Sequence, residues 1–256
     1  MKYKGFGKTH PGMKRELNED NFAILEEEGL FVVADGMGGH NAGEIASQIS
    51  IETISEFFEA SSKDEDMTWP YKLDPSLSLD ANKLMVGIKF ANRRIFRSAT
   101  SNTSFAGMGT TVVSILTGSG ENNEVYIAHV GDSRCYCFHN GTLNQVTEDH
   151  SLLNEYIKAG QITKEEAKNF PHKNVIMRAL GMKDNVIVDI MKREAKAGET
   201  YLICSDGLSD MVSDKDIEEI MSRNLSLEET TTLLIDQANA NGGKDNITVV
   251  LVKVEK

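Results

Sequence analysis

Strand-like segments joined by tight turns constrain the fold of this chain more than any other feature. Each is a short run of β-branched and other apolar residues, and the clearest turn between two of them is Asn140-Gly141, a pair typical of type I′ hairpin turns. The predicted strands cover residues 21–25, 30–34, 110–116, 125–130, 133–138, 142–146, 201–205 and 247–254. Because a tight turn joins antiparallel neighbours, the sequence predicts antiparallel sheets.

Four other segments repeat their apolar residues at helical spacing. The predicted helices cover residues 42–58, 84–95, 214–222 and 227–240. A helix with one apolar face must bury that face, and the outer faces of the sheets are the available surfaces. The predicted fold class is therefore α+β: a four-layer αββα sandwich of two antiparallel β-sheets with helices packed on both outer faces.

Two stretches fit this pattern less well. Residues 61–78 contain Trp69 and two prolines and are expected to form a surface loop. Residues 150–181 mix short helical pieces with polar runs and are expected to form an irregular excursion from the sheet. Since no Pro- or Ser-rich linker divides the chain, we expect a single domain over residues 1–256.

Composition excludes several classes of function. The formal net charge is −12 at pH 7, which disfavours nucleic acid as a partner. The longest apolar run, residues 30–34, is far too short to span a membrane, and the N-terminus lacks the apolar core of a signal peptide. Three cysteines without a CxxC pair favour buried free thiols over a disulfide or zinc site. We expect a cytoplasmic monomer that does not bind membranes.

Acidic residues lie at the ends of the predicted strands, mostly next to glycine. They are Glu19, Asp20, Asp35, Asp132, Asp206 and Asp245. Taken alone, each fits an ordinary turn or capping residue. If the strand ends converge, however, several carboxylates share a few ångströms and cannot all stay ionised without compensation. Hard divalent cations such as Mg²⁺ and Mn²⁺ supply that compensation through oxygen ligands, and a carboxylate bridging two metals positions and acidifies a water.

Arg15 lies five residues before Asp20. Taken alone, an arginine at such a position fits a surface ion pair. Beside a carboxylate–metal cluster, a phosphate clamp becomes the better interpretation, because a guanidinium binds phosphate bidentately.

These motifs, in this order, resemble those of the PPM (type 2C) metal-dependent serine/threonine protein phosphatases, in their compact bacterial branch. The matching signature consists of Arg15, Asn18-Glu19-Asp20, Asp35-Gly36-Met37-Gly38-Gly39-His40 with Gly43-Glu44, Gly109-Thr110-Thr111, Gly131-Asp132-Ser133-Arg134, Asp149-His150-Ser151, Arg178-Ala179-Leu180-Gly181, Ser205-Asp206-Gly207-Leu208 and Asp245-Asn246-Ile247-Thr248. The resemblance implies the same four-layer sandwich and the hydrolysis of phosphoserine and phosphothreonine esters by a water activated at a binuclear Mn²⁺ or Mg²⁺ centre. It also implies phosphorylated proteins, substrates of a serine/threonine kinase, as partners.

The resemblance assigns a role to each acidic residue. Asp35 would bridge the two metals, and Gly36 would offer its carbonyl oxygen as a ligand. Asp206 and Asp245 would complete the coordination of one metal. The ligands of the other metal, direct or through water, would be Glu19 and Asp20.

Three further roles follow from the resemblance. Asp132 would hold a third and weaker metal together with Asp206. Arg15 would bind the substrate phosphate. Residues 150–181 would form the flap beside the active site.

One position departs from the family pattern. Animal members have a histidine directly after the Asp-Gly pair, proposed as the general acid, and this chain has Met37 there. His40 lies three residues further on, and its reach decides whether it can donate a proton. A metal-bound water could protonate the leaving alkoxide instead. We interpret His150 as structural, because histidine commonly fixes a loop by hydrogen bonding.

Two alternatives remain open at this point. Another metal-dependent phosphoesterase, such as a phosphodiesterase or nuclease, would share the acidic cluster but should also bring a basic groove, which the sequence lacks. A catalytically inactive regulatory binding protein would be expected to lose a metal ligand, yet every carboxylate of the pattern is present. A phosphatase assay with and without a chelator separates these possibilities.

Overall fold

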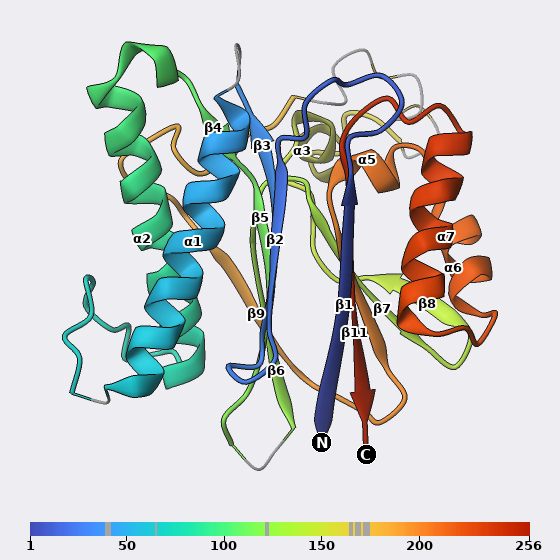
Figure 1. Ribbon diagram of the computed structural model, residues 1–256, viewed down its shortest axis with the longest axis horizontal. Helices are drawn as coiled ribbons and strands as arrows, with labels where there is room; N and C mark the ends of the chain where they lie inside the picture. Colours follow the sequence, from blue (N-terminus) through green and yellow to red (C-terminus); the bar gives the residue numbers. More distant parts are fainter. Residues whose placement is uncertain (39–41, 65, 121–122, 164–165, 167–169, 171–174) are drawn as a thin grey trace.

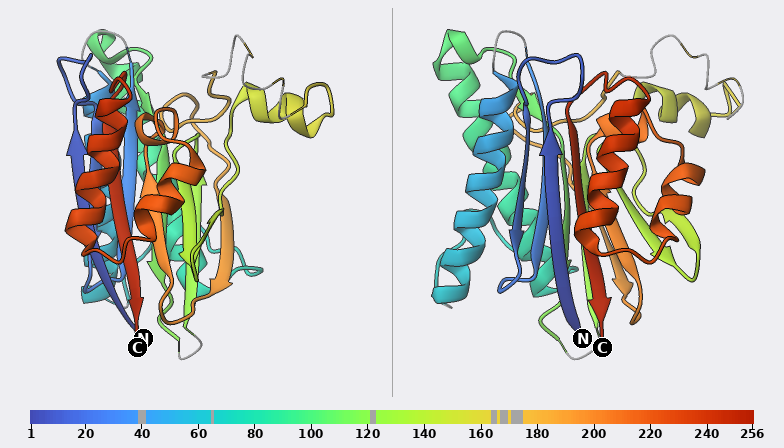
Figure 2. Two further views of the ribbon diagram at one scale, coloured as in Figure 1. Left: turned by 90° about the vertical axis from the view of Figure 1, so that its right-hand side faces the viewer. Right: turned by 45° about the vertical axis from the view of Figure 1, so that its right-hand side comes forward.

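The protein is a sandwich of two stacked antiparallel β-sheets with helices over both outer faces (Figure 1, Figure 2). The structure, a computed structural model, describes residues 1–256 except 39–41, 65, 121–122, 164–165, 167–169 and 171–174. This arrangement is the predicted four-layer fold. Within the described residues, no helix combines the length and apolarity needed to cross a membrane.

All strand pairs in both sheets are antiparallel. The first sheet has the order β1 (Lys2–His10), β11 (Ile247–Glu255), β10 (Thr200–Cys204), β7 (Arg134–His139) and β8 (Thr142–Gln145). The second has the order β2 (Asp20–Leu25), β3 (Leu30–Met37), β5 (Val112–Thr117), β6 (Glu124–Val130) and β9 (Asp189–Glu194), with β4 (Gly109–Thr110) paired to the end of β3.

The helices divide between the two outer faces. The second sheet is covered by α1 (Gly43–Lys63) and α2 (Leu79–Ser101). The first is covered by α5 (Asp206–Ser209), α6 (Asp214–Met221) and α7 (Leu227–Ala240). Two short elements, η1 (Thr103–Phe105) and α3 (Leu152–Lys158), lie in the connections.

Four layers create three interfaces, and each interface has its own apolar core. Alternate residues of one strand point into different cores: on β3, Leu30 and Val32 face the helices, whereas Phe31 and Val33 face the other sheet. Because both faces of β3 are buried, the strand is apolar throughout rather than alternating. Burying each such side chain contributes about 1.5–3 kcal/mol, which fixes the strand and the acidic residue at its end.

Several local predictions are confirmed. The hairpin turn at Asn140 and Gly141 has φ values of 50° and 79°, as a type I′ turn requires. All three cysteines are free and buried. Predicted helix 227–240 coincides with α7.

Other local predictions were wrong in detail. Predicted strand 110–116 is two strands, interrupted at Thr111, because the Thr111 N–H donates to the Asp35 carbonyl (2.8 Å) instead of continuing the ladder. Helix α1 extends to Lys63, so the expected loop 61–78 begins three residues later. Strand β3 does not end at Asp35 but continues to Met37 through its pairing with β4.

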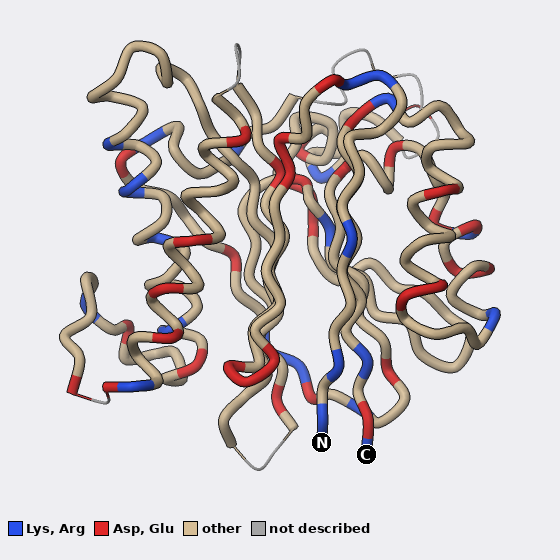
Figure 3. Tube along the Cα trace, viewed as in Figure 1, with Lys and Arg blue, Asp and Glu red and all other residues tan. Residues whose placement is uncertain are grey.

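The strand ends that carry the acidic residues all lie at one end of the sandwich, opposite the two chain termini (Figure 1). There β2 begins, β3 and β10 end, and β11 begins, and the short turn between β6 and β7 lies at the same end. Acidic positions of the central strands gather at this end in the charge view (Figure 3). The predicted convergence of the strand ends therefore results from antiparallel pairing within each sheet together with the stacking of the two sheets.

Candidate metal centre

Asp20 is the most constrained of the acidic residues. It lies opposite Asp35 in the β2–β3 register, and only 4% of it is exposed. Its Oδ2 atom accepts hydrogen bonds from the hydroxyls of Ser205 and Thr248, both at 2.7 Å. These two residues belong to the other sheet, so Asp20 links the two halves of the sandwich. Its Oδ1 atom is buried and has no hydrogen-bond partner among the residues that the structure describes, which leaves one carboxylate oxygen available for a cation.

Asp35 is held through its main chain rather than its side chain. Its N–H donates to the Thr111 hydroxyl (3.1 Å), and its carbonyl accepts from the Thr110 hydroxyl (2.8 Å). The pKa of the Asp35 carboxyl lies well above its usual range, first because of burial and then because of the charges of other carboxylates. Those neighbours are Asp20, Asp206, Asp132 and Asp245. Asp35 is therefore the point at which the acidic residues meet.

Asp206 follows β10 and opens the short helix α5. Burial raises its pKa well above the usual range, and the charges of Asp132 and Asp210 raise it further. Asp206 and Asp35 both stay partly accessible, in contrast to the buried Asp20. The two carboxylates can thus be reached from the solvent side, as a site that admits a substrate requires.

Asp132 lies in the turn between β6 and β7 and is 8% exposed. Burial raises its pKa to about 6, and the charge of Asp149 adds to this effect. Its Oδ1 atom is buried without a hydrogen-bond partner. It lines a small cavity of about 60 Å³ together with Asp206 and Asp149, so it faces the same acidic cluster from another side.

Arg15 and Asp245 form an ion pair at the rim of the cluster. The Arg15 Nη2 and Asp245 Oδ2 atoms are 2.8 Å apart, with side chains 51% and 40% exposed. An ion pair this exposed is worth only about 0.2–1 kcal/mol. Arg15 can therefore exchange this partner for a bound anion at little cost.

Glu19 and Gly36 are fixed to each other by their main chains. The Gly36 N–H donates to the Glu19 carbonyl at 3.1 Å. Burial raises the pKa of the Glu19 carboxyl, while a hydrogen bond from the backbone of Gly43 lowers it. A Cβ atom on Gly36 would lie 2.2 Å from the Gly43 carbonyl oxygen, so no other residue fits there.

The structure reveals residues that the sequence analysis did not single out for any role. Ser205, Thr248 and Thr111 supply the hydroxyls described above. Asn246 accepts a hydrogen bond from the Glu19 N–H (2.8 Å) and donates to the carbonyls of residues 11 and 17, which fixes the loop that carries Arg15. All four are close sequence neighbours of the acidic residues or lie inside the same motifs, which is the signal that could have identified them.

His40, weighed as a proton donor, and His150, interpreted as structural, differ in outcome. His40 lies outside the described residues. His150 is 6% exposed, and both of its ring nitrogens have partners, Gly131 and Asp189. At the position of the animal histidine, Met37 lies in β3 opposite Gly109.

The donor atoms of these residues have the chemistry that a divalent cation prefers. Buried carboxylates that repel one another are costly, and so are buried oxygens without partners, such as those of Asp20 and Asp132. A cation of charge +2 relieves both costs at once. The donors are all hard oxygen atoms, which suit Mg²⁺ and Mn²⁺ rather than metals that prefer sulfur.

Comparison with known sequences decides the family. The sequence model described as Protein phosphatase 2C matches residues 7–251. The chain belongs to the protein phosphatase 2C family. Membership confirms the family expected from the motifs, and with it the activity of a serine/threonine protein phosphatase, a phosphoric monoester hydrolase.

This phosphatase is similar to characterised bacterial proteins over its whole length. It is 39% identical over 253 residues to the serine/threonine phosphatase stp of Listeria welshimeri, covering 96% of this chain and 94% of that protein. It also resembles the crystal structure of the serine/threonine phosphatase PstP/Ppp of Mycobacterium tuberculosis, with a TM-score of 0.87, 35% identity and 100% coverage of both chains.

The family is metal-dependent, and one structural neighbour carries the metal. A crystal structure of the catalytic domain of PstP contains 2 manganese ions; it matches with a TM-score of 0.80 and 34% identity, covering 99% of each chain. The manganese ions in that relative agree with the metal dependence of the family.

Proposed function

We propose that this phosphatase hydrolyses phosphoserine and phosphothreonine esters of proteins at the buried acidic cluster, with Mn²⁺ or Mg²⁺ bound there. The observation that carries the proposal is the convergence of carboxylates: Asp20 lies opposite Asp35 in the β2–β3 register with a buried Oδ1 atom, and Asp132 and Asp206 line one small cavity. Burial and the charges of the four neighbouring carboxylates raise the pKa of Asp35 in agreement with this geometry. A cluster of that charge needs cations in order to stay ionised at neutral pH. Phosphorylated proteins are the corresponding partners.

The proposed ligands of the binuclear site are Asp35, as the bridge, and the carbonyl of Gly36. Asp206 and Asp245 would complete the coordination of one metal. The proposed ligands of the other metal, directly or through water, are Glu19 and Asp20. Support comes from the hydroxyls that orient Asp20 and leave its Oδ1 atom without a partner.

A third and weaker cation would be held by Asp132 with Asp206. Support comes from the unpartnered Oδ1 atom of Asp132 and from the small cavity that both residues line. A site with fewer protein carboxylates offsets less of the dehydration of the ion and therefore binds it less tightly.

When bound, the cations would acidify a water molecule and neutralise charge on the phosphoryl oxygens. The side chains of the protein would orient the metal ligands and bind the substrate phosphate. Ser205 and Thr248 hold Asp20 in place by donating to its Oδ2 atom. Arg15 leaves its exposed pairing with Asp245 and binds the phosphate through its guanidinium. Met37 has no proton to donate, so the group that protonates the leaving alkoxide is not the residue at this position.

We also propose that residues 150–181 act as a flap that tunes the choice of substrate. Support comes from the position of His150, at the start of this segment, next to the turn that carries Asp132. A single domain over residues 1–256, a monomeric state and a cytoplasmic location stay predictions.

The proposal is tested with three substrates at saturating Mn²⁺. We expect turnover of a phosphothreonine peptide and of p-nitrophenyl phosphate, and loss of both with EDTA. We expect no comparable turnover of the diester bis-p-nitrophenyl phosphate. Preference for the diester would favour the alternative phosphoesterase, and absence of all turnover would favour a regulatory binding protein.

A further inference from the structure

Beside the acidic cluster lies a second group of titratable side chains that the proposed chemistry does not use: His129, His150 and Asp189. One ligand atom from each lies within 4.8 Å of the others, a spacing that could hold a metal ion. His129 and His150 are 1% and 6% exposed, and their rings stack with centroids 4.5 Å apart. Asp189 lies on β9 directly opposite His129 on β6.

The hydrogen bonds of these residues argue against a metal site. The Nδ1 atom of His150 accepts from the Gly131 N–H (3.1 Å), so the proton of the neutral ring is on Nε2, which donates to Asp189 Oδ2 (3.2 Å). The other oxygen of Asp189 accepts from Arg178 at 2.6 Å. Since a neutral imidazole has a single nitrogen lone pair, His150 has none left for a metal.

His129 leaves one free atom. Its Nε2 atom must be the donor to the Glu148 carbonyl (2.8 Å), because a carbonyl oxygen only accepts. That leaves Nδ1 unprotonated and, among the described residues, without a partner. Burial lowers the pKa of both histidines. One available nitrogen does not make a metal site, so the role of the group must lie in the bonds that it already makes.

Those bonds converge on Gly131, the residue before Asp132. In addition to the ring contact, the His150 N–H donates to the Gly131 carbonyl at 2.9 Å, so His150 satisfies both polar groups of that residue. Gly131 has a φ of 114°, and a Cβ there would lie 2.6 Å from the Thr111 side chain. The turn thus adopts a conformation that depends on glycine and is clamped by His150.

Among the described residues, few other contacts orient the Asp132 carboxylate. Within the described part of the chain, its buried Oδ1 atom has no hydrogen-bond partner, whereas Asp20 is oriented by two hydroxyls. The direction of the Asp132 carboxylate therefore depends on the main chain of the turn.

We propose that His150 is a positioning residue for Asp132: it clamps the Gly131 turn so that the Asp132 carboxylate points into the acidic cluster, and Asp189 and Arg178 fix the tautomer that makes this possible. The inference rests on the proposed function, in which Asp132 helps to hold the weaker cation. It also links the C-terminal part of the flap segment to that cation, because the Met177 N–H donates to the His150 carbonyl at 2.7 Å.

Two substitutions separate the two ring contacts. In His150→Asn, the side-chain oxygen occupies the place of Nδ1 and can still accept from the Gly131 N–H. In His150→Gln, the amide reaches the place of Nε2 and can still meet Asp189, but nothing replaces Nδ1. His129→Gln is the matched control, since it keeps the donor to the Glu148 carbonyl and does not touch Gly131.

The measurement is turnover of p-nitrophenyl phosphate by the full chain as Mn²⁺ is raised from micromolar to millimolar, with the melting temperature of each variant. Loss of an outer partner of a metal ligand weakens metal affinity about 10- to 100-fold. We therefore expect His150→Gln to raise the half-saturating Mn²⁺ concentration of the weak phase about 10-fold, and His150→Asn and His129→Gln to stay within about 2-fold of wild type. The KM for p-nitrophenyl phosphate at saturating Mn²⁺ should not change.

Equal shifts in His150→Gln and His150→Asn, or a shift in His129→Gln as large as that in His150→Gln, would overturn the proposal, because packing alone would then explain the effect. If His150→Gln does not fold, Asp189→Ala at a partly exposed position removes the partner that fixes the tautomer. This variant should raise the same Mn²⁺ concentration about 3-fold, and a wild-type curve would overturn the proposal.

A further variant distinguishes failure of this inference from failure of the proposed function. Asp132→Asn should remove the weak Mn²⁺ phase, and adding His150→Gln should then have no further effect on the Mn²⁺ dependence. If Asp132→Asn removes the phase but His150→Gln leaves it unchanged, the positioning role alone is wrong. If Asp132→Asn keeps the phase, the proposed third cation is wrong, and the positioning role falls with it.

Discussion

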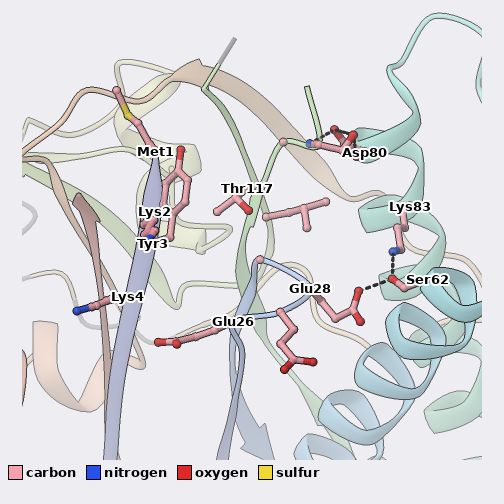
Figure 4. A pocket seen from close by; sticks show the side chains of 15 residues that line it. Met1, Lys2, Tyr3, Lys4, Glu26, Glu28, Ser62, Asp80, Lys83 and Thr117 are labelled. Atoms are coloured by element: carbon pink, nitrogen blue, oxygen red, sulfur yellow. Dashed lines mark hydrogen bonds between the residues drawn. The ribbon is translucent and has the colours of Figure 1, made fainter. Parts of the chain in front are cut away.

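Both ends of the sandwich carry many acidic side chains, but the surroundings of these side chains differ between the two ends. At the end with the acidic cluster, Asp20 and Asp132 are buried next to other carboxylates. At the opposite end, a hollow of about 620 Å³ is lined by Glu26, Glu28 and Asp80 together with lysines (Figure 4). The lysines are Lys2, Lys4 and Lys83.

At this opposite end Glu26, Glu28 and Asp80 have local partners. Glu26 accepts from the Gly5 N–H at 2.9 Å, and Asp80 accepts from the Ser119 N–H at 3.0 Å. Glu28 accepts from the Ser62 hydroxyl, which in turn receives a hydrogen bond from Lys83. Acidic residues alone therefore do not make a metal site. What distinguishes the other end is burial of several carboxylates that repel one another.

Substitution of an acidic residue of the cluster is expected to lower activity most at Asp35. In Asp35→Asn or Asp206→Asn, the loss of a ligand weakens metal binding and the acidity of the bound water. We expect kcat/KM for p-nitrophenyl phosphate to fall at least about 1,000-fold, or ~4 kcal/mol. Glu27→Gln at the opposite end is the control and should keep wild-type turnover. Wild-type activity in either Asp variant would mean that the cluster is misassigned.

Asp132→Ala tests the proposed third and weaker cation site of the same acidic cluster. It should lower kcat about 10- to 100-fold while the two tighter cations and the fold are retained. Kinetics at millimolar Mn²⁺, with a crystal structure of the variant soaked in Mn²⁺, check both halves. A normal kcat would exclude a catalytic role for the third cation and restore His40 as a candidate proton donor.

Arg15→Ala tests the proposed phosphate-binding role of Arg15 at the rim of the acidic cluster. If the guanidinium binds ground state and transition state alike, KM should rise about 10-fold while kcat falls less. Steady-state kinetics with a phosphothreonine peptide measure both constants. An unchanged KM would leave Arg15 as a surface partner of Asp245 only.

The pH dependence of stability should differ with and without metal. Burial, with nearby carboxylate charges, raises the pKa of Asp20 and Asp132 to about 6 in the folded protein, above that of an unfolded aspartate. The folded state then takes up protons as pH falls through 6 while the unfolded state does not. This contribution destabilises the folded protein above pH 6 and is relieved below it.

We therefore expect the melting temperature of the EDTA-treated protein to rise by about 5 °C between pH 7.5 and 5.5, relative to the Mn²⁺-loaded protein. Differential scanning fluorimetry across this range measures both curves. Parallel curves would mean that the cations do not bind at the raised-pKa carboxylates.

Features encoded by neighbouring residues could be predicted from the sequence. Helix α7 begins with a capping box in which Ser226 and Glu229 bond to each other's main chain, a pattern confined to four residues. The Asp-Gly pairs at Asp35 and Asp206 are equally local, and their place beside apolar strands is enough to indicate the acidic cluster.

Features that depend on distant residues could not be predicted. Strand β1 escaped notice because Gly5 and Gly7 break its pattern; they are explained only by Phe31 and Phe22, whose rings occupy the space of a side chain. Strand β9 is too highly charged for its sequence to indicate a strand. The hydroxyls that orient Asp20 come from residues 185 and 228 positions away.

We infer that the buried carboxylates form the cation site of this phosphatase. Equilibrium dialysis against Mn²⁺ at pH 7.5 tests this inference, with Asp35→Asn and Glu27→Gln dialysed beside the wild type. We expect two tightly held Mn²⁺ ions per chain in the wild type and in Glu27→Gln, and loss of tight binding in Asp35→Asn. Tight binding that survives in Asp35→Asn, or that disappears in Glu27→Gln, would contradict it.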